Sequence, residues 1–303
     1  MSESDKHKPH SADYFGEQRN FWWNQDFLEL MGKRWGLEKV STVLDVGCGI
    51  GHWGQILADI LPPNAKVTGI DKEAQWVEQA SERAKALNLA QRYNYTQGDA
   101  QELPFEDNSF DFVTCQTVLI HMKYPQLVIK EMVRVLKPGG LLVVVEPNNL
   151  VGSLIFDSLS FGDSIEKICL WVKFQLICER GKEALSEGNS SLGDLLPGYL
   201  ATANLRNIQV FLSDKAFSIF PPYLSKEQQV LKQEYLDWIR QNFWIWDKEE
   251  ARKYFLAGGG TEVEFELGWQ QRMEENKLLE KALIDESFHT AGGSICYLVS
   301  GYK

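Results

Sequence analysis

The chain has 303 residues, enough for one large domain or two modest ones. Hydrophobic residues make up 44% of it, which is ordinary for a globular protein in water. The 31 basic and 42 acidic residues give a net charge of −11, which disfavours a protein that binds the phosphate backbone of nucleic acids. We therefore do not expect nucleic acid as a partner.

The N-terminal residues, the apolar stretches and the cysteines indicate the cellular compartment. Residues 1–12 are polar, lack the apolar run of a signal peptide, and are expected to form a flexible tail. No uninterrupted apolar stretch approaches the roughly 18 to 20 residues that span a bilayer. The five cysteines are scattered and form no C-x-x-C pair, as is typical of a reduced compartment. We therefore expect a cytoplasmic protein without a membrane span.

The first half of the chain alternates short apolar runs with segments of helical periodicity. The expected strands are residues 42–46, 66–70, 93–97, 110–115 and 141–146. The expected helices are residues 54–60, 74–87 and 125–136. Continuous apolar strands that alternate with helices predict a parallel sheet covered on both faces.

The second half is mostly helical. Helices are expected within residues 150–190, 192–204, 225–253 and 264–285, and further strands at 208–219 and 294–302. We therefore predict a Rossmann-like, doubly wound α/β fold with a mostly parallel, seven-stranded sheet and a helical cap. In domain terms, residues 13–303 form one domain, with its core at 40–149, 191–220 and 292–303 and helical insertions at 150–190 and 224–290.

A glycine-rich stretch, VLDVGCGIGHWG, follows the first expected strand and leads into a helix. Such a turn brings backbone N–H groups close to a bound ligand. Gly49, Gly51 and Gly54 satisfy the G-x-G-x-x-G pattern of dinucleotide sites, but that short pattern is weak evidence alone. Both a dinucleotide and S-adenosylmethionine fit the glycines themselves.

Acidic residues around this stretch favour S-adenosylmethionine over a dinucleotide. Asp45 stands two residues before Gly47, where its charge would repel a pyrophosphate but suit a ligand with a cationic amino group. Asp71 ends the second strand, 20 residues after Gly51, where either ligand needs a carboxylate for its ribose. Asp99 follows the third strand, where it could accept a hydrogen bond from an adenine amino group.

Four motifs in this order and spacing resemble those of the class I S-adenosylmethionine-dependent methyltransferases: VLDVGCGIG, TGID, GDAQELPFEDNSFD and EMVRVLKPGGLLVVVEP. The resemblance covers about a third of the chain. It is strongest to the branch of the ubiquinone and menaquinone biosynthesis enzymes and other small-molecule methyltransferases. Together the motifs are specific, although each alone is modest.

The resemblance implies a role for each matching residue. Gly47, Gly49 and Gly51 would pack on the methionine part of S-adenosylmethionine, with Asp45 orienting their loop. Asp71 would accept the ribose hydroxyls beside Lys72, and Asp99 and the Ala100 amide would bind adenine. The Gln116 carbonyl would meet the methionine ammonium. The product would be S-adenosylhomocysteine.

For four further residues, both a functional role and a structural role are compatible with the sequence. Trp76 either packs on the adenine face or belongs to the core of its helix. His121 follows the fourth strand and is either a catalytic base or a structural histidine. Tyr14 and Arg19, in DYFGEQRNFWW, either pack on the domain or reach the methionine carboxylate as part of a flap.

The expected reaction is methyl transfer by in-line displacement, in which the protein aligns an acceptor and excludes water. The motifs of enzymes that methylate nucleobases are missing from the sequence. We therefore expect a small, partly apolar acceptor under a roof of helices, and no metal. The alternatives are a protein or RNA methyltransferase, or a non-catalytic regulator that binds the cofactor. The acceptor, its reacting atom and the oligomeric state do not follow from the sequence.

Overall fold

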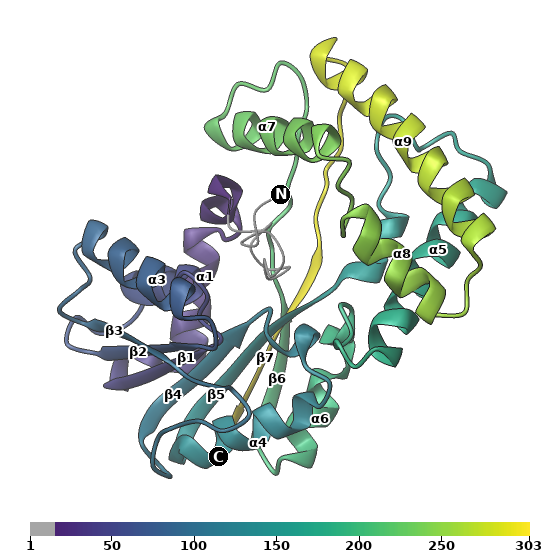
Figure 1. Ribbon diagram of the computed structural model, residues 1–303. Coiled ribbons are helices and arrows are strands. Elements are labelled where there is room, and N and C mark those ends of the chain that lie inside the picture. Colours follow the sequence, from purple (N-terminus) through teal and green to yellow (C-terminus); the bar gives the residue numbers. More distant parts are fainter. Residues whose placement is uncertain (1–15) are drawn as a thin grey trace. The chain divides into compact units, whose positions relative to one another are not determined.

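The computed structural model describes residues 16–303, which form two compact units (Figure 1). Unit 2 contains the sheet and comprises Trp23–Asn149, Ser186–Asp214 and Ile295–Lys303. Unit 1 is helical and, among the described residues, comprises 16–22, Leu150–Leu185 and Lys215–Ser294. The expectation that both units act as one domain, with the limits predicted above, stays a prediction.

Within the described residues, unit 2 has a seven-stranded sheet of order β3-β2-β1-β4-β5-β7-β6. The strands are β1 (Thr42–Val46), β2 (Lys66–Asp71), β3 (Tyr93–Gln97), β4 (Phe110–Gln116), β5 (Leu136–Asn148), β6 (Arg206–Leu212) and β7 (Ile295–Tyr302). The ladders from β3 to β5 are parallel, and β7 runs antiparallel to both of its neighbours. The predicted fold class is confirmed.

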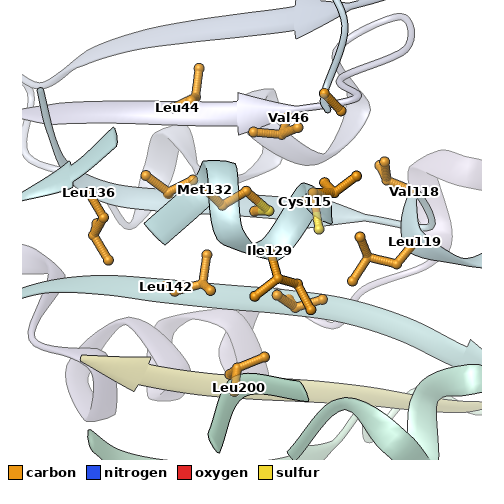
Figure 2. Close-up of a cluster of buried hydrophobic side chains, with 14 of the residues drawn as sticks. Leu44, Val46, Cys115, Val118, Leu119, Ile129, Met132, Leu136, Leu142 and Leu200 are labelled. Atoms are coloured by element: carbon orange, nitrogen blue, oxygen red, sulfur yellow. The ribbon is translucent and has the colours of Figure 1, made fainter. Parts of the chain in front are cut away.

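Helices cover both faces of this sheet, with α1 and α3 on one side and α4 and α6 on the other (Figure 1). The helices of unit 2 are α1 (Gln25–Trp35), α2 (His52–Ile56), α3 (Ala74–Ala86), α4 (Pro125–Val135) and α6 (Leu196–Thr202), with short 3-10 turns η4 (Leu37–Lys39), η5 (Leu57–Asp59), η6 (Leu119–His121) and η8 (Leu192–Leu195). Figure 2 shows the core on the α4 side, where Ile129 and Met132 meet Leu44, Cys115 and Leu142.

Side chains alternate along β1, and this alternation positions the candidate site. Leu44 and Val46 enter the α4 core, whereas Asp45 lies on the opposite face, beneath the start of α2. The carboxyl end of β1 lies between β2 and β4. The chain leaves β1 toward β2 and β3 and then crosses to β4 on the other side, so this end is the topological switch point where such sheets bind ligands.

Unit 1 is built from α5 (Ile165–Ala184), α7 (Lys226–Arg240), α8 (Lys248–Ala257) and α9 (Glu262–Ile284), with the 3-10 turn η3 (Glu17–Phe21). The 3-10 turn η7 (Asn149–Leu154) begins at the last residue of a unit 2 segment and leads into unit 1. Gly181 of α5 and Gly258 pack directly on backbone atoms of Tyr254 and Ile177, so a Cβ at either glycine would clash. The two glycines therefore allow α5 and α8 to cross at close range.

Two expected elements in the second half are wrong in extent. The strand expected at 208–219 ends at Leu212. The Ser213 N–H still donates to the Cys296 carbonyl oxygen at 2.9 Å, and β7, which begins at Ile295, offers no partner beyond that point. The single helix expected at 225–253 is two helices. Asn242 has a φ of 51° and ends the first, and Asp247 caps the second by accepting a hydrogen bond from the Glu250 N–H at 2.9 Å.

Candidate functional site

The glycine loop after β1 requires glycine at three positions. Gly47, Gly49 and Gly51 have φ angles of 64°, 51° and 82°, which residues with a side chain rarely adopt. A Cβ at Gly47 would lie 2.5 Å from Val118 Cγ2, and one at Gly51 would lie 2.5 Å from Gln55 Nε2. The loop backbone therefore packs closely against Val118 and Gln55, and these contacts fix its conformation.

Asp45 lies beneath this loop and is almost fully buried, with 1% of its surface exposed. Its Oδ2 accepts a hydrogen bond from the Gly54 N–H at 3.0 Å, at the start of α2. Its Oδ1 has no hydrogen-bond partner among the described residues. Burial raises the pKa of Asp45 to about 7, and the nearby charge of Asp71 adds to the rise. A cationic ligand would favour the ionised form of this carboxyl.

Asp71 connects the glycine loop to the next strand. Its Oδ2 accepts from the Gly49 N–H at 2.8 Å, and its Oδ1 accepts from the Glu73 N–H at 2.9 Å. Burial raises its pKa, and these hydrogen bonds oppose the rise. A carboxylate can accept about four hydrogen bonds, so Asp71 keeps capacity for a further donor. The bond to Gly49 is one that the sequence did not predict.

The end of β3 lies beside the end of β2. The Gly98 N–H donates to the Asp71 carbonyl oxygen at 2.9 Å, which places Asp99 directly beyond Asp71 at the same sheet edge. Asp99 is exposed and accepts from the Gln101 N–H at 2.8 Å, whereas Ala100 is buried. The structure therefore brings Asp45 of β1, Asp71 at the end of β2 and Asp99 after β3 to one edge, as expected for parallel strands.

Trp76 and Lys72, which follow Asp71 in the sequence, differ in exposure. Trp76, in the first turn of α3, is 8% exposed. This burial is compatible with a residue of the helix core and also with a residue that packs on the adenine face. The Lys72 side chain is exposed, and its carbonyl oxygen accepts from Gln97 Nε2 at 2.9 Å. The cofactor roles of both residues remain predictions.

Beyond β4, the chain makes a tight turn that Glu146 of β5 fixes. The fully buried Glu146 accepts hydrogen bonds on Oε1 from the N–H groups of Val118 at 2.9 Å and Leu119 at 2.7 Å. These bonds hold the first turn of η6, which ends at the half-buried His121. Glu146 is thus a positioning residue, a role visible only once β4 and β5 are paired.

Gln116 and a later glycine complete this side of the site. The Gln116 carbonyl oxygen accepts from the Thr117 hydroxyl at 2.8 Å, and Thr117 has a φ of 53°. Gly188 has a φ of 90°, and a Cβ there would clash with the Ile120 carbonyl oxygen and lie 2.8 Å from the His121 carbonyl carbon. The segment that re-enters unit 2 after α5 therefore packs directly on the turn that carries His121.

The N-terminal residues of the expected flap are Tyr14 and Arg19. Tyr14 is outside the described residues. Arg19 belongs to η3 of unit 1, where its guanidinium lies 4.4 Å from the ring centre of Trp22. The expectation that either residue reaches the cofactor stays a prediction.

Residues 16–303 contain neither a group of side chains suited to a metal ion nor a membrane-spanning helix. In that range no three histidine, cysteine or acidic side chains are grouped so that they could hold a metal ion. None of the helices in the same range combines the length and the apolar character needed to cross a membrane.

Comparison with known proteins agrees with this geometry. Residues 37–190, just over half of the chain, match the family model described as a methyltransferase domain. Demethylmenaquinone methyltransferase from Staphylococcus aureus (strain JH9) is 41% identical over 114 residues, which cover 38% of this chain and 46% of that protein. The match thus spans about half the length of the curated relatives.

Solved structures share the fold. A protein from Galdieria sulphuraria assigned as a sarcosine dimethylglycine methyltransferase has a TM-score of 0.51 at 17% identity, covering 92% of this chain and 84% of its own. A protein from Bacillus halodurans C-125 assigned as a methyltransferase has a TM-score of 0.51 at 20% identity, covering 92% and 99%. Sheet order, motifs and family match agree, and the chain belongs to the methyltransferase-domain family, in the class I S-adenosylmethionine-dependent group.

Proposed function

We propose that this protein binds S-adenosylmethionine at the glycine loop and transfers its methyl group to a small, partly apolar molecule. The observation that carries the proposal is the loop itself, whose three left-handed glycines are held between Asp45 and Asp71 at the switch point of the sheet. Two carboxylates at this position suit a cationic ligand better than a pyrophosphate.

The residues at the sheet edge fit the parts of this cofactor. Asp71 has acceptor capacity left for a ribose hydroxyl, and Asp99 and the Ala100 amide follow at the end of β3 for the adenine. The Gln116 carbonyl keeps a lone pair for the methionine ammonium, and the charge of Asp45 supports the same end of the ligand. When bound, the sulfonium supplies an electrophilic methyl group, and S-adenosylhomocysteine remains.

The protein's own part in the reaction is alignment and proton removal. The Glu146 bonds fix η6, and through it the backbone of His121, beyond the carboxyl end of β4. We assign His121 as the base for an acceptor that must lose a proton. The curated relative from Staphylococcus aureus is named for a quinone substrate, and this supports a partly apolar acceptor here.

Calorimetry with Asp71→Ala tests the cofactor assignment. Charged hydrogen bonds are worth about 1.5–3 kcal/mol each, so the variant should bind S-adenosylmethionine at least tenfold more weakly. Asp59→Ala is the matched control, because it removes an exposed carboxylate from the same unit. We expect the control to bind like the wild type and NAD to bind neither protein.

A second variant is needed, because Asp71→Ala also removes the acceptor of the Gly49 N–H, which holds the glycine loop. Asp71→Asn keeps an oxygen for one backbone N–H and loses the charge. An unchanged affinity in both variants, with melting temperatures close to the wild type, would overturn the assignment.

A further inference from the structure

Strand β6 forms one edge of the sheet in unit 2 (Figure 1). It pairs with β7 on one side and, within the described residues, with no strand on the other. Residues 207–212, NIQVFL, contain neither a charged residue nor a proline, two of the features that protect edge strands from pairing. Val210 and Leu212 are 45% and 51% exposed. The strand therefore has an uncharged and partly apolar outer edge.

The hydrogen bonds to β7 determine which backbone groups face this outer edge. The Ser213 N–H donates to the Cys296 carbonyl oxygen at 2.9 Å, just past the end of β6. In an antiparallel ladder, every second residue directs both its N–H and its C=O toward the same neighbouring strand. Phe211 therefore faces β7 with its backbone, as Ser213 does, whereas Val210 and Leu212 direct their N–H and C=O groups outward.

The two faces of β6 are in contact with the unit's own helices. Ile208 packs against the core cluster that contains Leu200 of α6. On the opposite face, the Arg34 guanidinium of α1 lies 5.0 Å from the ring centre of Phe211. The ladder to β7 is irregular before Gln209, so the regular part of the edge is short. What β6 offers to a partner is therefore its backbone edge and the apolar side chains beside it.

This edge is complementary to a second copy of itself in the antiparallel orientation. Residues whose backbone groups face outward pair with one another across such an interface. A two-fold axis through Val210 then pairs Val210 with its own copy and Ile208 with Leu212 of the second copy. The exposed Arg206 and Asp214 lie four residues before and after Val210. The same axis therefore brings opposite charges together at both ends of the strand pair.

We propose that the protein forms a two-fold homodimer in which the β6 strands of two copies pair antiparallel and join their sheets. A second copy fits this edge better than an extended segment of another protein, because the apolar residues and the end charges match their own reverse order. Pairing along one short strand buries a small area, so the dimer is reversible and depends on protein concentration. The proposal concerns unit 2 alone and does not depend on methyl transfer.

Sedimentation velocity of the full chain over a wide range of concentrations tests the association. We expect the mass to rise from that of the monomer to twice that value. Val210→Lys places two like charges at the two-fold axis and should weaken the dimer about tenfold or more, with little change in the melting temperature of the exposed site. Leu127→Lys, at a 47% exposed leucine on α4, is the matched control and should associate like the wild type.

A charge exchange tests the orientation of the strands. Arg206→Asp and Asp214→Arg each place like charges at both ends of the pair and should weaken the dimer. The double variant restores opposite charges and should associate more tightly than either single variant. This rescue separates pairing from folding effects, because Asp214→Arg also removes the acceptor of the Asn24 Nδ2 hydrogen bond, at 3.1 Å, and the double variant does not restore it.

Disulfide cross-linking tests the register. Val210→Cys brings two cysteines opposite each other, with Cα atoms about 5.5 Å apart, which a disulfide can bridge. Leu212→Cys does not, because its partner is Ile208. Both variants are made with Cys169→Ser, which removes an exposed cysteine. We expect oxidation to cross-link Val210→Cys much faster than Leu212→Cys.

Four results would overturn the proposal, whether or not the protein binds S-adenosylmethionine. They are a wild type that stays monomeric at every concentration, a dimer that Val210→Lys leaves unchanged, a double charge variant no better than the single ones, and equal cross-linking of the two cysteine variants. The first of these would leave the edge to an extended segment of another protein.

Discussion

Asp45→Asn removes a buried charge from beneath the glycine loop. Asp45 is 1% exposed, and burial together with Asp71 raises its pKa from 3.8 to about 7. Between these two values the native state binds a proton that the unfolded chain has released. The free energy of unfolding of the wild type should therefore fall as pH rises from about 4 to 7, and the Asp45 contribution should level off above that.

The size of the effect follows from linkage. A shift of about three pKa units corresponds to roughly 4 kcal/mol in full, of which about 2.5 kcal/mol develops between pH 5 and pH 8. Asparagine does not titrate, and its side-chain oxygen can still accept from Gly54. The stability of Asp45→Asn relative to the wild type should therefore increase by about 2.5 kcal/mol from pH 5 to pH 8.

Urea denaturation of both proteins at the two pH values measures this difference. Groups that do not interact with Asp45 titrate alike in both proteins, so their contributions cancel, and the difference reports Asp45 together with its coupling to Asp71. Asp59→Asn, which changes an exposed carboxylate, should show the same stability difference from the wild type at both pH values. A difference between Asp45→Asn and the wild type that does not change with pH would refute the reasoning about Asp45.

Four further changes have definite outcomes. Gly51→Ala, at a φ of 82°, should cost about 1–3 kcal/mol in urea denaturation and weaken cofactor binding in calorimetry. Glu146→Ala leaves two buried N–H groups unpaired and should cost about 2–5 kcal/mol in the same denaturation assay, whereas Glu146→Gln should cost less. His121→Ala should lower kcat about 10²- to 10⁴-fold at unchanged cofactor Kd; a parallel loss of melting temperature would make it structural. The fragment 1–149 should be insoluble in expression trials, because β5 loses its partner β7; a soluble, cooperatively folding fragment would contradict this.

Most strands in the first half could be predicted because they are short runs bounded by clear breaks, although the strand expected at 141–146 extends over Leu136–Asn148. Residues 42–46 and 93–97 were expected as strands and are β1 and β3. The edge that carries Asp45, Asp71 and Asp99 followed from parallel strands alone. The end of β6 could not be predicted, because it depends on where the distant β7 begins, and the local alternation continues past that point.

The details of the site depend on backbone conformation and long-range pairing, which residue types do not reveal. The bond from the Gly49 N–H to Asp71 needs the left-handed turn at Gly49. The role of Glu146 needs the register of β4 against β5.

Transfer of a labelled methyl group tests the central claim most directly. The purified protein is incubated with a cell extract and methyl-labelled S-adenosylmethionine at a subsaturating concentration, and the products are separated by size, with the weaker-binding Asp71→Ala as the comparison. The account predicts label in the small-molecule fraction with the wild type and much less with the variant. Label confined to protein or RNA would contradict the proposed acceptor class. No transfer above the variant, by a protein that binds the cofactor, would contradict the proposed activity.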